Sequence, residues 1–448
     1  MSTTSRFFHS QCVARAAALL LACLPLWVAA QVGAQVVEQA ALPGGLPPEP
    51  LLRQALLQAP QADAANASHR AEQAQADQLR LGPNDWVLRA GIAQRSERGG
   101  ASFNEREIAI ERTLRWGRKS AQDQALADQT LRLASLRRQA AWQASASALL
   151  AQWFDARRDQ QAAWHQQQQA ALAQALVTVV QRRVAAGDAA ALLLRQAEGE
   201  LARTAGAQAA AEQRADNSRL ALLHQYPLLA AAWPAAGAAA ASHATAPTRP
   251  DAAPTSGQGA ALAADLVGRL LAQQPLLASA QAEVVLARQQ LGRLESDRTA
   301  DPTLGLRFAQ ERGGAERVLG LTVSMPFGGA LRDSRVQAGG AALAAAEARL
   351  RGLQLQLAAE AQRLAAAPQQ ASTVLQRLQA AAFAAETSAR LTERAQAEGE
   401  STLAELLQQQ RQAGDSALAA ALAAIDLHEA RARLQLAQQQ LLAGDASP

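Results

Sequence analysis

The chain of 448 residues is long enough for two or three ordinary domains, but only 3% of its residues are aromatic, which is too little bulk for several globular cores. Its excess of alanine, glutamine, leucine and arginine favours long packed helices instead. The formal net charge is +4 and no basic block carries interleaved aromatic residues, so a nucleic-acid partner has little support.

Residues 1–30 are predicted to be a secretory signal peptide. Basic residues precede the apolar run from Ala16 to Ala30, which is too short to span a bilayer comfortably. Cleavage after Ala30 or Ala34 would leave a mature chain without cysteine, because Cys12 and Cys23 are both upstream. Lipid attachment at Cys23 is the alternative, although the residues after it stay apolar. An exported chain without disulfides indicates a bacterial envelope protein that packing or oligomerisation stabilises.

Four landmarks recur in one order at a spacing of about 210 residues, which indicates an internal duplication. The matching residues are Pro60 and Pro275, Gly99 and Gly313, Gly117 and Gly328, and Gly187 and Gly399. The sequence therefore predicts a first repeat at 31–225, a Pro/Ala/Gly-rich linker at 226–262 and a second repeat at 263–448.

Each repeat is expected to contain a helix, a β-hairpin, a long helix, a glycine interruption and another helix. The first helices are expected at about 50–81 and 263–298, and a long helix over 119–184 would measure roughly 95 Å. In the second repeat, leucines recur every seven residues, as in a coiled-coil seam, at Leu343, Leu350, Leu357 and Leu364. An ordinary antiparallel helical bundle is the alternative. After the signal peptide, no run of about 18 apolar residues predicts a transmembrane helix.

The hairpins alternate apolar residues with small or polar ones, at period two. Their strands are expected at about 85–97, 103–116, 302–311 and 316–327. Strands of roughly ten residues can cross the hydrocarbon layer when tilted, but four cannot close a barrel, for which about eight are the minimum. Closure would therefore require several copies of the chain. The alternative is a pair of small β-tabs on a soluble helical protein.

A few residues in or near these strands bear on whether the strands cross a membrane. Arg112 interrupts an apolar face, and since a charge at the bilayer midplane costs roughly 2–4 kcal/mol, we expect it near a membrane boundary or turned toward the lumen. Trp86, Trp116 and Phe327 near the strand ends are either interfacial anchors or simple packing residues.

Three pairs of duplicated motifs carry a resemblance to a known family. They are the proline contexts (LLQAPQADAANA and LLAQQPLLASAQAE), the hairpin exits (REIAIERTLRWGRK and ERVLGLTVSMPFGGALRD) and the glycine tips (RRVAAGDAAALLLRQAEGELA and ERAQAEGESTLAELLQQQRQAG). In this order, over nearly the whole mature chain, they resemble the TolC-type outer-membrane efflux proteins. The RWGRK exit looks most like the heavy-metal cation-efflux branch.

The resemblance implies a fold that is mainly α with a membrane β-barrel contribution: a homotrimer with a 12-stranded β-barrel in outer-membrane lipid and an α-barrel in the periplasm. It further implies a passive conduit that exports small solutes, with divalent metal cations as one candidate. Its partners would be a periplasmic adaptor (membrane fusion protein) and an inner-membrane pump of the RND type. The competing hypothesis is a periplasmic coiled-coil adaptor or scaffold protein without a channel. The third hypothesis is a degenerate family member, because Arg112, the single tyrosine and the Ala-rich linker depart from a typical outer-membrane barrel.

The resemblance also implies two sites. The helical-hairpin tips at 184–188 and 396–400 would dock the adaptor, and their candidate residues are Val184, Gly187, Asp188, Gln396, Gly399 and Glu400. The alternative is that both glycines are plain helix C-caps. Glu405 would form an acidic ring at the periplasmic aperture, but a further acidic position of the family is Gln408 here, and the matching place in the first repeat is Leu193.

No enzyme, cofactor or metal site is predicted. Five histidines lie beyond the signal peptide without HxxxH or HExxH spacing: His69, His165, His224, His243 and His428. No phosphate-binding loop follows a strand, and no Ser/His/Asp arrangement is legible.

Overall fold

The computed structural model describes residues 45–96, 98–100, 102–234 and 256–442. The predicted signal peptide, Cys23 and the middle of the predicted linker lie outside these residues. The chain forms two compact units, each assembled from three separate stretches. Among the described residues, the hairpin unit comprises 45–58, 149–234 and 369–432, and the sheet unit comprises 59–96, 98–100, 102–148, 256–368 and 433–442.

The first helix of each repeat is divided in two, which differs from the single helices expected at 50–81 and 263–298. The pieces are α3 (Glu49–Leu57), α4 (Pro60–Leu81), α8 (Ser256–Ala272) and α9 (Pro275–Ser296). Pro60 and Pro275 each start the second piece. Proline lacks the N–H that a helix interior needs and pushes the preceding residue toward extended backbone, so it starts a helix better than it continues one.

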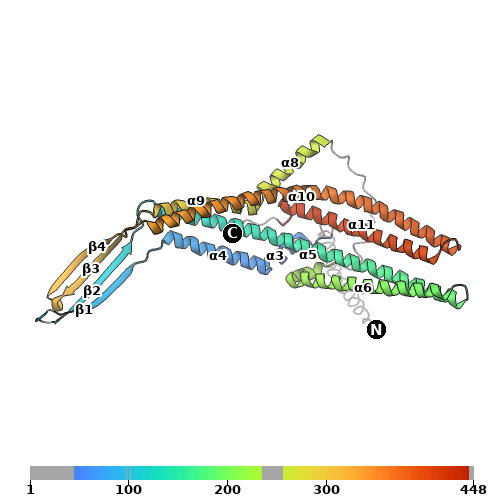
Figure 1. Cartoon of the computed structure of the whole chain (residues 1–448), viewed down its shortest axis with the longest axis horizontal. Helices are drawn as coiled ribbons and strands as arrows, with labels where there is room; N and C mark the ends of the chain where they lie inside the picture. The colour runs from blue at the N-terminus through green and yellow to red at the C-terminus, as the bar shows by residue number, and fades with distance from the viewer. Residues whose placement is uncertain (1–44, 97, 101, 235–255, 443–448) are drawn as a thin grey trace, which may run out of the picture. The chain divides into compact units, whose positions relative to one another are not determined.

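The sheet unit carries one antiparallel sheet in the order β1-β2-β3-β4. Its strands are β1 (Val87–Ser96), β2 (Ser102–Thr113), β3 (Thr303–Glu311) and β4 (Glu316–Ser324). The two hairpins join through β2 and β3, with Ile110 opposite Leu306, so segments far apart in the sequence lie side by side (Figure 1). The second hairpin turns through the short helix η2 (Arg312–Gly314), where Gly313 has a φ of 68°.

Two long helices each contribute to both units. They are α5 (Lys119–Ala185) and α10 (Ala330–Ala397), and α10 passes from one unit to the other at Pro368, a proline inside the helix. In the sheet unit, Leu270, Ala361 and Ala437 form a buried cluster. Within the described ranges, no helix is both long and apolar enough to cross a membrane.

The hairpin unit contains two helical hairpins. One is α5 with α6 (Ala191–Gln225), and the other is α10 with α11 (Leu403–Ala437). The start of the predicted linker packs into this unit as the short helix η1 (Pro227–Ala232), which contacts α3 and α6. Tyr226 and Leu229 are buried there, and the rings of Trp153 and Trp233 meet edge to face with centroids 5.1 Å apart.

Arg115, two residues after the end of β2, fastens the end of α4 to the start of α5. Its guanidinium donates to the carbonyls of Leu79, Arg80 and Leu81 at 3.2–3.3 Å and to Asp123 at 3.1 Å. It therefore satisfies carbonyls that the end of a helix leaves without intrahelical partners. A Cβ at Gly82 would lie 2.7 Å from the Arg115 Cζ, so this contact requires glycine there.

Lys119, the first residue of α5, joins the two repeats. Its ammonium donates to the Thr299 carbonyl at 2.7 Å and the Asp301 carboxylate at 2.8 Å, and it pairs with Asp297 at 3.2 Å. The side chain is only 4% exposed. Since Asp301 also accepts the Trp116 backbone N–H at 2.9 Å, one carboxylate holds both the exit of β2 and the start of α5.

Candidate functional site

One face of the sheet is largely apolar and exposed, except for Arg112 and, toward the turns, a row that contains Arg106, Gln310 and Arg317. The register aligns Leu88, Ile110, Leu306 and Leu321 in one row across all four strands. The adjacent row is Ala90, Ile108, Phe308 and Leu319. Leu319 is 73% exposed and Ile92 is 84% exposed, so this face has no cover within the described chain. A soluble protein rarely leaves an apolar patch of this kind open to water.

The opposite face is polar and carries diagonal ion pairs between neighbouring strands. Each pair joins an arginine to a glutamate of the neighbouring strand: Arg89 with Glu111 at 3.2 Å, Arg95 with Glu105 at 3.0 Å, and Arg307 with Glu107 at 2.9 Å. Small residues fill the space between them. A Cβ at Gly305 would collide with the Thr322 side chain and lie 2.8 Å from Glu111 Cγ, so the close packing of this face depends on glycine.

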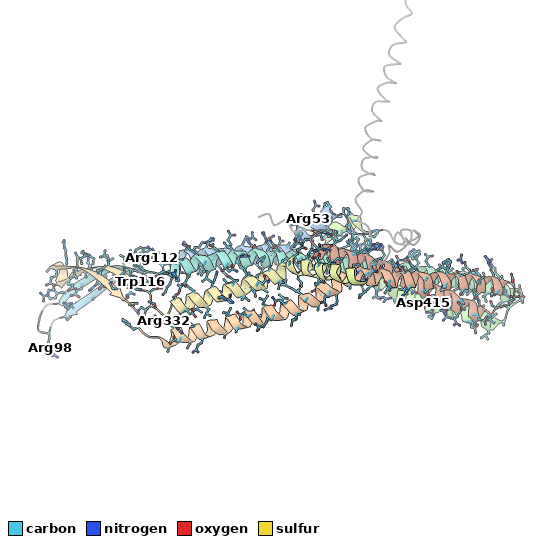
Figure 2. All side chains as sticks on the ribbon, turned by 90° about the horizontal axis from the view of Figure 1, so that it is seen from above. Arg53, Arg98, Arg112, Trp116, Arg332 and Asp415 are labelled. Atoms are coloured by element: carbon cyan, nitrogen blue, oxygen red, sulfur yellow. The ribbon has the colours of Figure 1, made fainter. Side chains whose placement is uncertain are left out.

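Arg112 stays on the apolar face and does not turn to the polar one. It lies opposite Leu304 in the register, one residue before β2 ends, and its guanidinium carbon is 5.1 Å from the centre of the Trp86 ring. Figure 2 shows it near Trp116, where the strands join the helices. A cation over an aromatic face at the end of a strand is the arrangement expected of an interfacial residue, and the membrane boundary itself stays a prediction.

The outer edges of the sheet belong to β1 and β4. In the described chain, neither of these strands has a partner on its outer side. Unpaired N–H and C=O groups of an edge strand readily pair with another chain.

Both helical hairpins turn through the same hydrogen-bonded motif. In the first turn, the backbone N–H of Gly187 donates to the carbonyl of Val184, and that of Asp188 donates to the carbonyl of Arg183. In the second turn, the backbone N–H of Gly399 donates to the carbonyl of Gln396, and that of Glu400 donates to the carbonyl of Ala395. This is the Schellman arrangement, which places a residue in the left-handed region just after the helix. Gly187 and Gly399 have φ of 77° and 80°, which accounts for glycine at both places. The two turns lie at the same end of the hairpin unit (Figure 1).

The predicted docking residues differ in how they are presented. Gly187, Asp188, Gly399 and Glu400 are exposed, whereas Gln396 is half-buried. Val184 is also half-buried and packs against a cluster built from α5, α6 and α11, so its side chain supports the turn from inside. Asp188 also pairs with Arg183 at 3.3 Å, which braces the first turn.

Glu405 has a local structural role that the sequence analysis did not identify. Its backbone N–H donates to the Thr402 hydroxyl at 3.2 Å, and its carboxylate accepts the Thr402 backbone N–H at 2.9 Å. This reciprocal pair is a capping box at the start of α11. The sequence signal for this capping box is a threonine followed three residues later by a glutamate. The other helix start, at Ala190, has no side-chain cap, so the two hairpin turns differ chemically.

No metal centre is formed by the residues that the structure covers: no three His, Cys, Asp or Glu side chains group there as ligands. His165 is half-buried with its ring edge-on to Trp164 at 4.9 Å, and burial lowers the pKa of its imidazole. A lowered pKa keeps this histidine neutral near pH 7.

Solved outer-membrane channels have a similar fold. The CmeC outer membrane channel of Campylobacter jejuni matches with a TM-score of 0.70 at 12% identity, covering 87% of this chain and 84% of CmeC. The outer membrane protein VceC of Vibrio cholerae matches with a TM-score of 0.68 at 17% identity, covering 88% of this chain and 95% of VceC. The open state of the MtrE outer membrane channel of Neisseria gonorrhoeae gives 0.64 at 16% identity, covering 87% and 88%. No family model and no curated protein matches the sequence.

At this low identity the likeness establishes the fold alone. The chain has the fold of these outer-membrane channels, and the prediction of a mainly helical protein with an antiparallel sheet is confirmed. The closed barrel, the trimer and the heavy-metal branch stay predictions.

Proposed function

We propose that the chain is one protomer of a homotrimeric outer-membrane channel that serves as the exit conduit of a tripartite efflux system. The observation that carries the proposal is the two-faced sheet, whose outer edges have no partner among the described residues. Three copies would supply twelve strands, β1 of one copy pairing with β4 of the next. Closure would remove every edge, turn the apolar face toward lipid and leave the Arg–Glu pairs facing a water-filled lumen.

In this function the chain would catalyse no reaction. It would act as a passive conduit that carries small solutes from the periplasm to the exterior, and divalent metal cations are one candidate cargo. The energy would come from an inner-membrane pump of the RND type, joined through a periplasmic adaptor. The protein would then reside in the outer membrane and extend into the periplasm.

The two helical-hairpin turns are the proposed adaptor-docking sites. Their support is the matched geometry: each offers an exposed glycine followed by an exposed acidic residue, Gly187 with Asp188 and Gly399 with Glu400. Glu405 is the proposed aperture residue. Its carboxylate is exposed while it caps α11, and an acidic ring at a narrow mouth would attract cations.

Membrane fractionation followed by gel migration without boiling tests the channel. We expect recovery in the outer membrane as a species of trimer size, and stepwise conductance when the purified protein is added to a planar lipid bilayer. A soluble periplasmic monomer would refute the channel and favour the competing adaptor or scaffold function.

Cysteine crosslinking tests the docking sites. Asp188→Cys and Glu400→Cys introduce thiols beside the two glycines without changing either one, and Gly206→Cys, exposed within α6 with open space around it, is the matched control. With a co-expressed periplasmic adaptor, we expect crosslinked products from the first two variants only. Equal crosslinking at all three positions, or none, would show that the turns are plain helix caps.

A further inference from the structure

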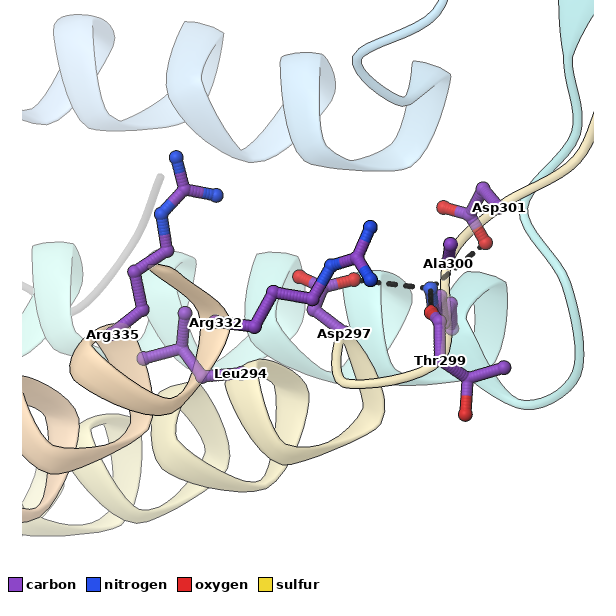
Figure 3. A pocket seen from close by; sticks show the side chains of 8 residues that line it. Leu294, Asp297, Thr299, Ala300, Asp301, Arg332 and Arg335 are labelled. Carbon is purple, nitrogen blue, oxygen red and sulfur yellow. Dashed lines mark hydrogen bonds and ion pairs between the residues drawn. The ribbon is translucent and has the colours of Figure 1, made fainter. Parts of the chain in front are cut away.

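A polar pocket lies where the end of α9, the loop before β3 and the first turns of α10 meet (Figure 3). Its cavity volume is about 200 Å³, several times the roughly 30 Å³ that a water molecule occupies in the liquid. The polar lining comprises Lys119, Asp297, Thr299, Asp301, Arg332 and Arg335. All of these residues belong to the sheet unit.

The negative charges of the pocket are already neutralised by partners other than its two arginines. Asp301 accepts from Lys119, and Asp297 pairs with both Lys119 and Arg293. Burial alone would raise the pKa of Asp297, but the hydrogen bonds from Arg293 and Lys119 outweigh it and hold that pKa below its usual range. Asp297 is therefore ionised and paired at neutral pH, and Asp301 is paired with Lys119.

The two arginines keep unused donors. Arg332 donates to the Gly328 carbonyl at 3.0 Å, and Arg335 makes no hydrogen bond or ion pair with any described residue. Three positions apart in the first turns of α10, they share a face of the helix. Figure 3 shows Arg332 extending over the pocket toward Asp297, with Arg335 one turn further on.

This part of α10 is an unfavourable place for two cations. The N-terminus of a helix carries a partial positive charge and favours anions. Arginine recognises a phosphate through paired hydrogen bonds, so two guanidinium groups with spare N–H donors at such an end match the chemistry of this anion.

Large apolar side chains near the pocket are exposed. Leu331, 67% exposed, lies four residues before Arg335 on the same side of α10, and Phe327, 95% exposed, precedes the helix. Asp301 also binds the backbone of Trp116, whose side chain is exposed. Through Asp301 the pocket is therefore linked to Trp116, near the end of the apolar face of the sheet. Figure 2 shows Arg332 in the same region as Trp116.

We propose that this pocket binds the phosphate group of a phospholipid in the periplasmic leaflet of the outer membrane. The inference rests on the proposed function, because only a sheet that crosses the membrane brings the pocket to the level of lipid headgroups. Arg332 and Arg335 hold the phosphate, and the exposed side chains of Phe327 and Leu331 lie against the acyl chains. The bound lipid would fix the depth at which the sheet sits in the bilayer.

Native mass spectrometry of the detergent-extracted full-length protein tests the proposal. The probes are dioleoyl-phosphatidylglycerol, dioleoylglycerol, which lacks the phosphate, and inorganic phosphate. The variants are Arg335→Gln, which removes no described contact, and Arg332→Gln/Arg335→Gln. Arg351→Gln, an exposed arginine further along α10, is the matched control.

We expect the unmodified protein and Arg351→Gln to retain phosphatidylglycerol at one lipid per protomer. Loss of charged hydrogen bonds should weaken retention at least about tenfold in the double variant and by less in Arg335→Gln. Dioleoylglycerol should not be retained. Equal retention in all variants, or retention of dioleoylglycerol, would overturn the proposal, and displacement of the lipid by equimolar inorganic phosphate would identify free phosphate as the ligand.

The same samples are run on the unboiled gel, which separates this proposal from the proposed function. An outer-membrane trimer without specific lipid retention refutes only the lipid site. A soluble monomer refutes the channel and the lipid site together.

Discussion

Substitution of Lys119 by methionine tests whether the buried ion network holds the sheet to the helices. Methionine keeps the length and apolar character of the side chain but removes the ammonium, which has three acceptors. The Asp301 side chain is 18% exposed and would be left with the Trp116 N–H as its remaining donor. Asp297 is 39% exposed, so solvent would compensate much of its loss.

Breaking a buried ion pair by removing one partner costs about 3–5 kcal/mol. We expect the lower end, a loss of about 3 kcal/mol in the free energy of unfolding, because Asp301 retains one donor and some contact with water. Arg118→Met is the matched control, since Arg118 is an exposed neighbour without a side-chain partner among the described residues. Its effect should stay within about 0.5 kcal/mol.

Urea unfolding of the detergent-solubilised chain, followed by circular dichroism, measures both changes. A double-mutant cycle with Asp301→Asn isolates the pair, for which we expect a coupling energy of about 1–3 kcal/mol. The reasoning fails if Lys119→Met unfolds like Arg118→Met, or if the coupling energy is near zero.

Three further outcomes follow from single contacts. Gly399→Ala should lower the free energy of unfolding by about 1–2 kcal/mol, because an L side chain is strained at a φ of 80°. The control Gly340→Ala, within α10 with open space around it, should leave the free energy of unfolding unchanged or raise it. An equal change in both variants would contradict the argument. Thr402→Ala should cost about 1 kcal/mol and speed amide hydrogen exchange in the first turn of α11, whereas Thr402→Ser should not; unchanged exchange would remove the capping box. The lowered pKa of Asp297 means that its ion pairs stabilise the fold above the usual aspartate pKa of about 3.9 and that this contribution is lost as the pH falls further. Asp297→Asn should therefore be less stable than the unmodified protein at pH 7 and approach its stability below about pH 3.9; a difference that persists in acid would contradict this sign.

Much of the local structure is readable from neighbouring residues. Alternation at period two predicts the strands, and the observed β3, Thr303–Glu311, lies within the expected 302–311. The positive φ at Gly187 and Gly399 follows from the need of a helix reversal for a left-handed residue. The capping box at Thr402 and Glu405 also depends only on residues three positions apart. It gives Glu405 a structural role in addition to its predicted role at the aperture.

Pro60 and Pro275 mark the duplication in the sequence, and in the structure each also separates two helices, since α3 and α8 end shortly before them. The residue type contained that information, because the missing N–H and the fixed φ of proline act on its immediate neighbours.

The sequence by itself determined the long helices, the duplicated hairpins and the conformation of the turns, because periodicity and φ preferences depend on residues a few positions apart. Only the tertiary structure decided that β2 pairs with β3, that Lys119 reaches Asp301, and that Lys119 of the first repeat lines the same pocket as Arg332 and Arg335 of the second. These contacts join residues about 200 positions apart, and many pairings of such segments satisfy the same local preferences. Their choice depends on which side chains meet when the whole unit packs, and no short window of the chain contains that information.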